Sequence, residues 1–142
     1  MNKKKIFVLL YILKNINFSM NQTSEVSDNE QFEASDKELV LKYKKLEDHC
    51  IIKLRAKDTP KSVLSTLKKS QFKEYSSKFL NDLGIKMSEK NEFDLAKELF
   101  ELAINEDPIF YEPWKNLSKI IKDKDMSKSN TYKKISENLN SE

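Results

Sequence analysis

The chain has 142 residues, of which 35% are charged and 38% hydrophobic, and it contains one glycine, three prolines and one cysteine. β-Hairpins and β-barrels need more turn residues than this chain contains. The composition therefore favours an all-α fold around one modest core. The net charge of +3 is too small to indicate a nucleic-acid-binding protein by itself.

The N-terminal segment, residues 1–20, reads MNKKKIFVLLYILKNINFSM, in which three lysines precede the apolar run Ile6–Leu13. A positive start followed by a short apolar run is typical of a secretory signal peptide. The run is far shorter than the roughly 20 residues of a membrane-spanning helix. We therefore predict an exported protein that is periplasmic, in the envelope or secreted. The alternatives are an uncleaved N-terminal membrane anchor and an ordinary first helix of a cytoplasmic protein.

The next segment, residues 21–36, reads NQTSEVSDNEQFEASD and holds five acidic residues and no basic one. Its only aliphatic or aromatic side chains are Val26 and Phe32, and they follow no helical or strand period. Such a segment buries too little surface to offset its ordering entropy. The sequence therefore predicts a disordered acidic linker before a helical domain over residues 37–142.

Two helices are expected first in this domain. Ser35 and Glu38 form a capping-box pattern, which predicts a helix start with Ser35 as the N-cap. Thr59 and Pro60 predict the second start, with Thr59 as N-cap and Pro60 as the first helical residue. The apolar residues at helical spacing are Leu39, Tyr43, Leu46, Cys50 and Leu54 in the first helix and Val63, Leu64 and Leu67 in the second.

Four more helices follow, which gives six helices joined by short turns in antiparallel pairs. They are expected from near Gln71 to Ser88, after an N-cap at Asn91, from near Pro113, and over residues 127–139. Their predicted inward residues are Phe72, Phe79, Leu80, Leu83 and Met87; Phe93, Ala96, Phe100 and Ala103; Trp114, Leu117 and Ile121; and Tyr132, Ile135 and Leu139.

An internal repeat of 34 residues relates the third helix to the fifth. The spacing joins Leu80 to Trp114, Leu83 to Leu117, Gly84 to Ser118 and Met87 to Ile121. With Ala96, Phe100, Ala103 and Pro108, this register resembles the tetratricopeptide repeat (TPR), whose pattern is W-x2-L-G-x2-Y, then A-x3-F, then P. Residues 77–110 make one good copy and residues 111–139 a degenerate one. The resemblance implies a short α-solenoid of stacked antiparallel helix pairs that acts in protein–protein interaction.

Gly84, the only glycine, lies within a helical pattern, where glycine costs about 0.5–1 kcal/mol relative to alanine. We expect it to face Ala96 and Ala103 where two helices approach closely, with Phe100 filling the space beside them. The alternative is a glycine that ends the helix, but the helical pattern continues through Met87.

Catalytic chemistry finds no support in the residues. One glycine cannot supply a phosphate-binding loop or a dinucleotide fingerprint, and the single histidine and single cysteine cannot build a zinc site. His49 and Cys50 are adjacent on a predicted helix, so their side chains diverge by about 100°. We expect His49 on the helix surface and Cys50 buried. The sequence thus predicts a non-enzymatic protein without a cofactor or metal.

The predicted function is an adaptor that binds a peptide or partner helix in a concave groove. The resemblance implies that the first helix of each pair lines this groove, through Lys78, Asn81, Ile85 and Ser88 in one copy and Glu112, Lys115, Lys119 and Lys122 in the other. The lysines favour an acidic partner, unless they only solvate the helix. The alternative function is a lysine-rich binder of nucleic acid or anionic surfaces, which the inward placement of most aromatic residues disfavours. Membrane contact is expected only through an uncleaved N-terminus.

Overall fold

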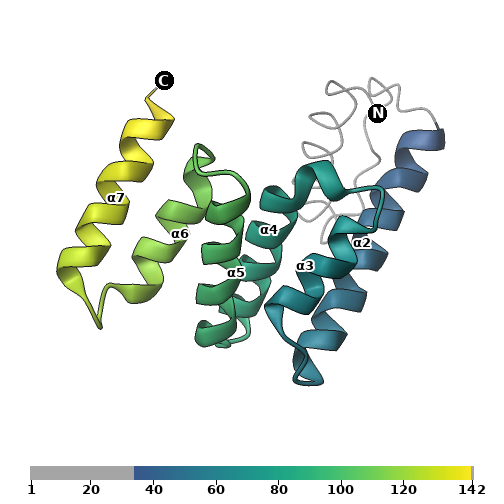
Figure 1. The fold of residues 1–142 in the computed structure, drawn as a ribbon, viewed down its shortest axis with the longest axis horizontal. Helices are drawn as coiled ribbons and strands as arrows, with labels where there is room; N and C mark the ends of the chain where they lie inside the picture. The colour runs from purple at the N-terminus through teal and green to yellow at the C-terminus, as the bar shows by residue number, and fades with distance from the viewer. Residues whose placement is uncertain (1–33, 142) are drawn as a thin grey trace, which may run out of the picture. The chain divides into compact units, whose positions relative to one another are not determined.

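The computed structural model describes residues 34–141, and every regular element in this range is helical. The elements are α2 (Ala34–Arg55), α3 (Pro60–Lys68), the 3-10 turn η1 (Lys73–Tyr75), α4 (Ser76–Glu89), α5 (Phe93–Glu106), α6 (Tyr111–Ile121) and α7 (Met126–Asn140), as Figure 1 shows. The prediction of an all-α fold is confirmed for the described residues. The predicted signal peptide and most of the predicted linker lie outside them.

The described residues divide into two units, residues 34–48 and residues 49–141. In the described part of the first unit, α2 buries Val40, Tyr43 and Glu47, while the predicted inward residues Leu39 and Leu46 are only half-buried. The helix begins at Ala34, so the last three residues of the predicted linker are helical and Ser35 lies inside the helix instead of capping it.

In the second unit, the start of α3 is formed as the sequence predicts. Thr59 is the N-cap and its hydroxyl accepts a hydrogen bond from the backbone N–H of Ser62 at 3.1 Å. Pro60 is the first helical residue, where its missing N–H leaves no donor unsatisfied. Val63 and Leu67 are fully buried. The next long helix starts later than predicted, because residues 73–75 form the 3-10 turn before α4 begins at Ser76.

The helices α3 to α7 pack in sequence order. Consecutive helices run antiparallel across short turns, so α4 packs on α5 and α6 on α7 (Figure 1). Each pair also contacts its neighbours: α6 packs on both α4 and α5, and α3 packs on both α4 and α5. The largest fully buried side chains of this core are Phe79, Phe100, Leu67, Leu80, Leu83, Met87, Leu99 and Leu117.

Two helices end in the left-handed backbone conformation without glycine. Lys57 after α2 has φ 68° and Asn91 after α4 has φ 62°. At each end, the N–H of this residue bonds a carbonyl three residues back and the next N–H bonds one five residues back, which is the Schellman arrangement. Asn91 therefore ends α4, and the prediction that it caps α5 is wrong. Glu92 occupies that cap position without a side-chain hydrogen bond, and Phe93 is 49% exposed instead of inward.

Gly84 lies where α4 meets the ring of Phe100 on α5. A Cβ added to Gly84 would lie 2.5 Å from Cε1, 2.8 Å from Cδ1 and 2.9 Å from Cζ of Phe100. Ordinary carbon contacts lie at about 3.5–4.0 Å, so glycine lets the ring pack directly on the backbone of α4. Ala96 and Ala103, on the same helix as Phe100, are fully buried.

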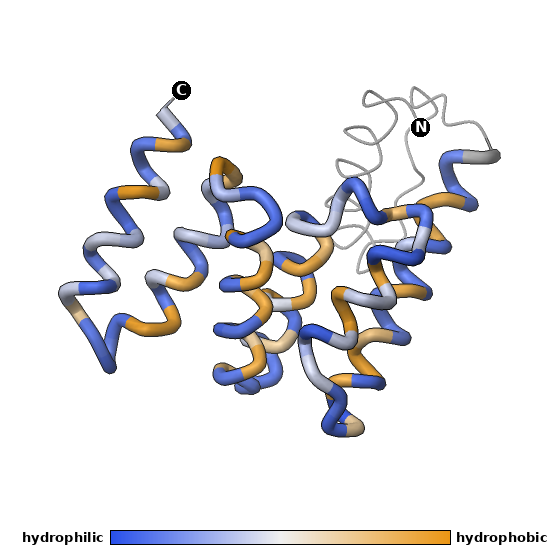
Figure 2. The backbone as a smooth tube through the Cα atoms, in the orientation of Figure 1, coloured by the Kyte–Doolittle hydropathy of each residue, from blue (hydrophilic) through white to orange (hydrophobic). Residues whose placement is uncertain are grey.

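Hydrogen bonds between two serines join α6 to α7, whereas α4 and α5 meet through Gly84 and the ring of Phe100. The hydroxyl of Ser118 donates to the carbonyl of Ser129 at 3.0 Å, and the hydroxyl of Ser129 donates to the carbonyl of Ser118 at 2.8 Å. Ser129 and Ser136 are the buried residues of α7, and they follow Ala96 and Ala103 by 33 residues. The predicted inward residues Tyr132, Ile135 and Leu139 are half-buried, and α7 is mostly hydrophilic along its length (Figure 2).

The residues of the predicted repeat pattern occupy different environments. Trp114 is half-buried, and its Nε1 donates a hydrogen bond to the carbonyl of Pro108 at 2.9 Å. The rings of Trp114 and Tyr132 pack edge to face, with their centroids 5.5 Å apart. Pro108 itself is exposed in the turn before α6. The buried residues of the pattern are Leu80, Leu83, Gly84, Met87, Ala96, Phe100, Ala103, Leu117 and Ile121.

Candidate functional site

A partly buried polar network connects α4 to α6. The side-chain amide of Asn81 donates to Glu112 Oε2 at 3.2 Å, and its oxygen accepts from Asn116 Nδ2 at 3.0 Å. Lys78 Nζ lies 3.0 Å from Asp82 Oδ1 and 3.7 Å from Glu112 Oε2. The network thus holds together the first helices of two successive pairs through charge-assisted hydrogen bonds.

The two carboxylates also set the ionisation of Lys78. Burial alone would lower the pKa of Lys78, because it disfavours the charged amine. Asp82 and Glu112 together outweigh this effect and raise the pKa above its ordinary value of 10.5. Lys78 therefore stays charged and bound to its two acids over the whole physiological range.

This network changes the set of groove residues expected from the sequence. Asn81 is fully buried and both ends of its amide are engaged, so it has no surface to offer a partner. Lys78 is half-buried in ion pairs with the protein's own acids, and Glu112 is half-buried in the same network. Ile85 and Ser88 are half-buried on α4. Lys78 and Asn81 thus serve the packing of α6 on α4.

The lysines of α6 lie differently. Lys115, Lys119 and Lys122 are all exposed, and their spacing of four and three residues places them on one face of the helix. They line a groove of about 490 Å³ between α6 and α7. The α7 wall contributes Lys133 and Glu137, and the remaining lining residues are Tyr111, Ser118, Ser129, Asn130, Ser136 and Asn140.

This surface, the α6–α7 groove, has a polar floor and a net positive charge. Ser118 and Ser129 lie buried beneath the groove, and each hydroxyl donates a hydrogen bond to the backbone carbonyl of the other serine. Four lysines and one glutamate line its walls. No ion pair joins any of the four lysines to another residue in the range 34–141.

Unpaired lysines also occur elsewhere in residues 34–141, Lys61 and Lys69 among them, so the groove is distinguished by having four of them on one surface, whereas some lysines of the described chain have acidic partners. Those partnered lysines are Lys42 with Glu38, Lys68 with Glu106, Lys78 with Asp82 and Glu112, and Lys97 with Glu101. The groove therefore concentrates positive charge that the described residues leave uncompensated, and such a surface attracts an anionic partner.

Lys133 was missed by the sequence reasoning. The helical period predicted that Tyr132 faces inward. Tyr132 lies two positions before Lys134, the residue that follows Phe100 by 34, and this prediction left Lys133 as an ordinary surface residue. The burial of Ser129 and Ser136 shows that α7 is rotated so that Lys133, midway between them in sequence, lies on the groove side. The only signal in the sequence was the seven-residue spacing that this serine pair shares with Ala96 and Ala103.

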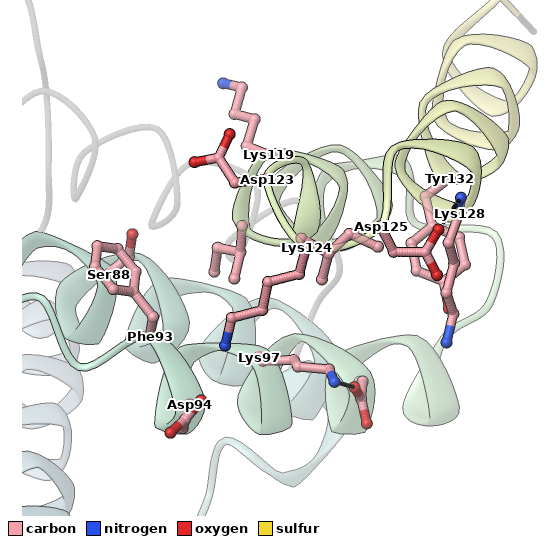
Figure 3. Close-up of a pocket in the computed structure, with 13 residues that line it drawn as sticks. Ser88, Phe93, Asp94, Lys97, Lys119, Asp123, Lys124, Asp125, Lys128 and Tyr132 are labelled. Atoms are coloured by element: carbon pink, nitrogen blue, oxygen red, sulfur yellow. Dashed lines mark hydrogen bonds and ion pairs between the residues drawn. The ribbon is translucent and has the colours of Figure 1, made fainter.

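A second groove, of about 540 Å³, lies where α5 meets the end of α6 and the start of α7 (Figure 3). Phe93 and Tyr132 lie at its two ends, and Lys124 extends from the α6–α7 turn toward α5. Lys128 Nζ lies 5.7 Å from the centroid of the Tyr132 ring. The groove is lined by four lysines and four acids, Lys97, Lys119, Lys124, Lys128, Asp94, Glu101, Asp123 and Asp125. The formal charges of these lining residues balance, so the net charge of this mixed-charge groove gives no reason to expect a charged partner of either sign.

No three His, Cys, Asp or Glu side chains among residues 34–141 gather as they would around a metal ion. No helix in this range is long and apolar enough to span a bilayer. His49 is exposed and Cys50 fully buried.

Comparison with known proteins returned no match to this chain, whether against protein-family models, curated protein sequences or solved structures.

Proposed function

We propose that this chain is a non-enzymatic protein-interaction adaptor built as a short TPR-like α-solenoid. The observation that carries the proposal is the α6–α7 groove, whose four lysines have no acidic partner in the described chain. A surface of this size and charge fits a peptide or a partner helix that supplies carboxylates.

The TPR-like assignment is supported by the way the pairs stack. The pairs α4–α5 and α6–α7 pack in sequence, and α6 contacts both helices of the pair before it. In each pair a small residue of the first helix contacts the second helix, Gly84 in α4 and Ser118 in α6, and these two residues are 34 positions apart. A repeat array uses such positions to bring helices together, and each pair then adds interaction surface.

The proposal includes export of the protein, which rests on the signal-like residues 1–20 of the sequence alone. An N-terminal anchor and a cytoplasmic location are the alternatives. Sequencing the N-terminus of the protein recovered from each cell fraction separates the three. Full-length protein in the soluble cytoplasmic fraction would overturn the export proposal, and a shortened N-terminus outside the cytoplasm would support it.

Selection from a displayed random-peptide library tests the adaptor function. The full chain should enrich peptides that bind saturably, and Lys115→Glu/Lys119→Glu/Lys122→Glu should lose them while keeping the helical circular dichroism of the wild type. Failure to enrich any peptide, together with strong and steeply salt-dependent binding of mixed-sequence DNA, would overturn the adaptor function in favour of nucleic-acid binding.

A further inference from the structure

The packing of α6 on the preceding pair shows how this fold receives a helix. α6 lies against both α4 and α5. It brings the carboxylate of Glu112 to the amine of Lys78 and the amide of Asn81 on the receiving helix. One acidic side chain on the incoming helix thus meets cationic and amide groups on the receiving one.

The equivalent receiving surface on the next pair is uncovered. The residues of α6 that follow Asn81, Ile85 and Ser88 by 34 positions are Lys115, Lys119 and Lys122. In α4, Asn81 is fully buried beneath α6 and the other two are half-buried. In α6, all three lysines are exposed, and no helix within residues 34–141 lies over the α6–α7 groove that they line.

We propose that the α6–α7 groove receives a helix of a partner protein, seated as α6 is seated on α4 and α5, and that this helix carries an acidic stripe. The inference rests on the proposed adaptor function and names the chemistry and conformation of its partner. Lys115, Lys119 and Lys122 span about 10.5 Å along α6, since each residue rises 1.5 Å. A partner helix with Glu or Asp at positions i, i+4 and i+7 repeats that spacing along one face.

A helical partner fits this groove better than an extended one. An extended segment must find partners for its own backbone N–H and C=O groups. The four ammonium groups of the groove can donate but not accept, and its side-chain acceptors for backbone N–H groups are few, chiefly Glu137, Asn130 and Asn140. The Ser118 and Ser129 hydroxyls donate to each other's backbone carbonyls. A helix satisfies its backbone internally and presents only side chains to the walls. Its carboxylates then meet the unpaired lysines of α6 and Lys133 of α7.

The polar floor sets the character of the contact. Serines lie beneath the lysines and the walls carry a net positive charge, so charge decides which partner is favoured, while the apolar parts of the lining side chains remain available for packing. The partner helix needs small or polar residues where it faces Ser118, Ser129 and Ser136. We expect fast association that weakens strongly with salt.

Three labelled peptides of about 18 residues, or about five helical turns, test the proposal by fluorescence anisotropy with the full chain. The first is a side-chain-stapled helix with glutamates at i, i+4, i+7 and i+11. The second is a stapled helix of the same composition with the glutamates distributed around its axis. The third has the first peptide's glutamate spacing but carries two central prolines that prevent a helix.

The striped helix should bind about tenfold or more tightly than either control peptide in low salt, because only it presents its carboxylates on one helical face. The substitutions Lys115→Glu/Lys119→Glu/Lys122→Glu should abolish this preference. The matched control, Lys97→Glu/Lys124→Glu/Lys128→Glu, makes the same charge change in the mixed-charge groove and should keep it.

The following results would each contradict one part of the reasoning. Equal binding of the proline peptide overturns the helical partner. Equal losses in the two triple variants overturn the α6–α7 groove as the site. If the striped helix fails to bind while library-selected peptides bind, this inference fails and the adaptor function stands. If neither binds, the adaptor function fails as well.

Discussion

Replacing Gly84 with alanine tests whether the ring of Phe100 requires a residue without a side chain on α4. The added methyl would lie 2.5 Å from the nearest ring carbon, whereas carbons in contact are separated by about 3.5–4.0 Å. The ring would have to retreat by about 1 Å, and Phe100 is only 1% exposed, so its neighbours would have to move with it. Such overpacking costs about 1–3 kcal/mol.

Helix propensity acts in the opposite direction. Alanine is better than glycine inside a helix by about 0.5–1 kcal/mol, so the net destabilisation should be about 1 kcal/mol. For a helical unit of this size, that lowers the thermal midpoint by about 4–8 °C. Gly84→Leu should lower it further, because a larger side chain must be accommodated.

The assay is thermal and urea unfolding followed by circular dichroism. Ser65→Ala, at an exposed position of α3, controls for the propensity gain and should leave the midpoint unchanged or slightly higher. In the Gly84→Ala background, Phe100→Leu should cost less than it does in the wild type, because the smaller side chain relieves the clash. A Gly84→Ala midpoint at or above the wild-type value would refute the reasoning.

Three further predictions concern helix ends and the polar network. Lys57→Gly should raise the free energy of unfolding by about 0.5–1 kcal/mol and Asn91→Gly by less, because both residues have positive φ and asparagine tolerates that conformation better than lysine. Urea midpoints measure both changes, and the control Ala56→Gly, one position before Lys57, should lower stability. Asn81→Ala should cost about 1–3 kcal/mol by leaving Glu112 and Asn116 short of partners, and unchanged stability would contradict the network. The pKa of Lys78 is raised above 10.5, so its ion pairs should stabilise the fold fully below about pH 10.5 and be lost as the pH rises through the raised value. Lys78→Met should therefore be less stable than wild type at neutral pH, with the gap closing above pH 10.5; a constant gap would show that charge is not the cause.

Part of the candidate site could be predicted from the sequence. The spacing of Lys115, Lys119 and Lys122 placed them on one face of a helix before any packing was considered, and they are exposed there. The resemblance to the tetratricopeptide repeat implied that Lys78 and Asn81 line the groove, but Asn81 is buried and both side chains bond Glu112 of α6. A period tells which residues share a face, and it cannot tell which helix from elsewhere in the chain will cover that face.

The helix ends, like the candidate site, could be predicted only in part. Thr59 and Pro60 acted through the hydrogen bonds and backbone angle of a few adjacent residues, so the start of α3 was predictable. Asn91 is favoured both as a cap and in the left-handed conformation, so its residue type left two uses open. Its positive φ shows that it ends α4.

The sequence by itself determined that the described chain is helical, where most helices lie and most of the buried positions of the α4–α5 pair, because these depend on interactions within one or two turns. Only the tertiary structure decided that Phe100 packs on Gly84, that Glu112 reaches Asn81, and that Lys133 joins the α6 lysines in one groove. Gly84 and Phe100 are 16 positions apart, Asn81 and Glu112 are 31 apart, and Lys133 lies 11 to 18 positions after the α6 lysines. The geometry of these contacts depends on how far one helix rotates and slides against another, which the shapes of all the packed side chains decide together.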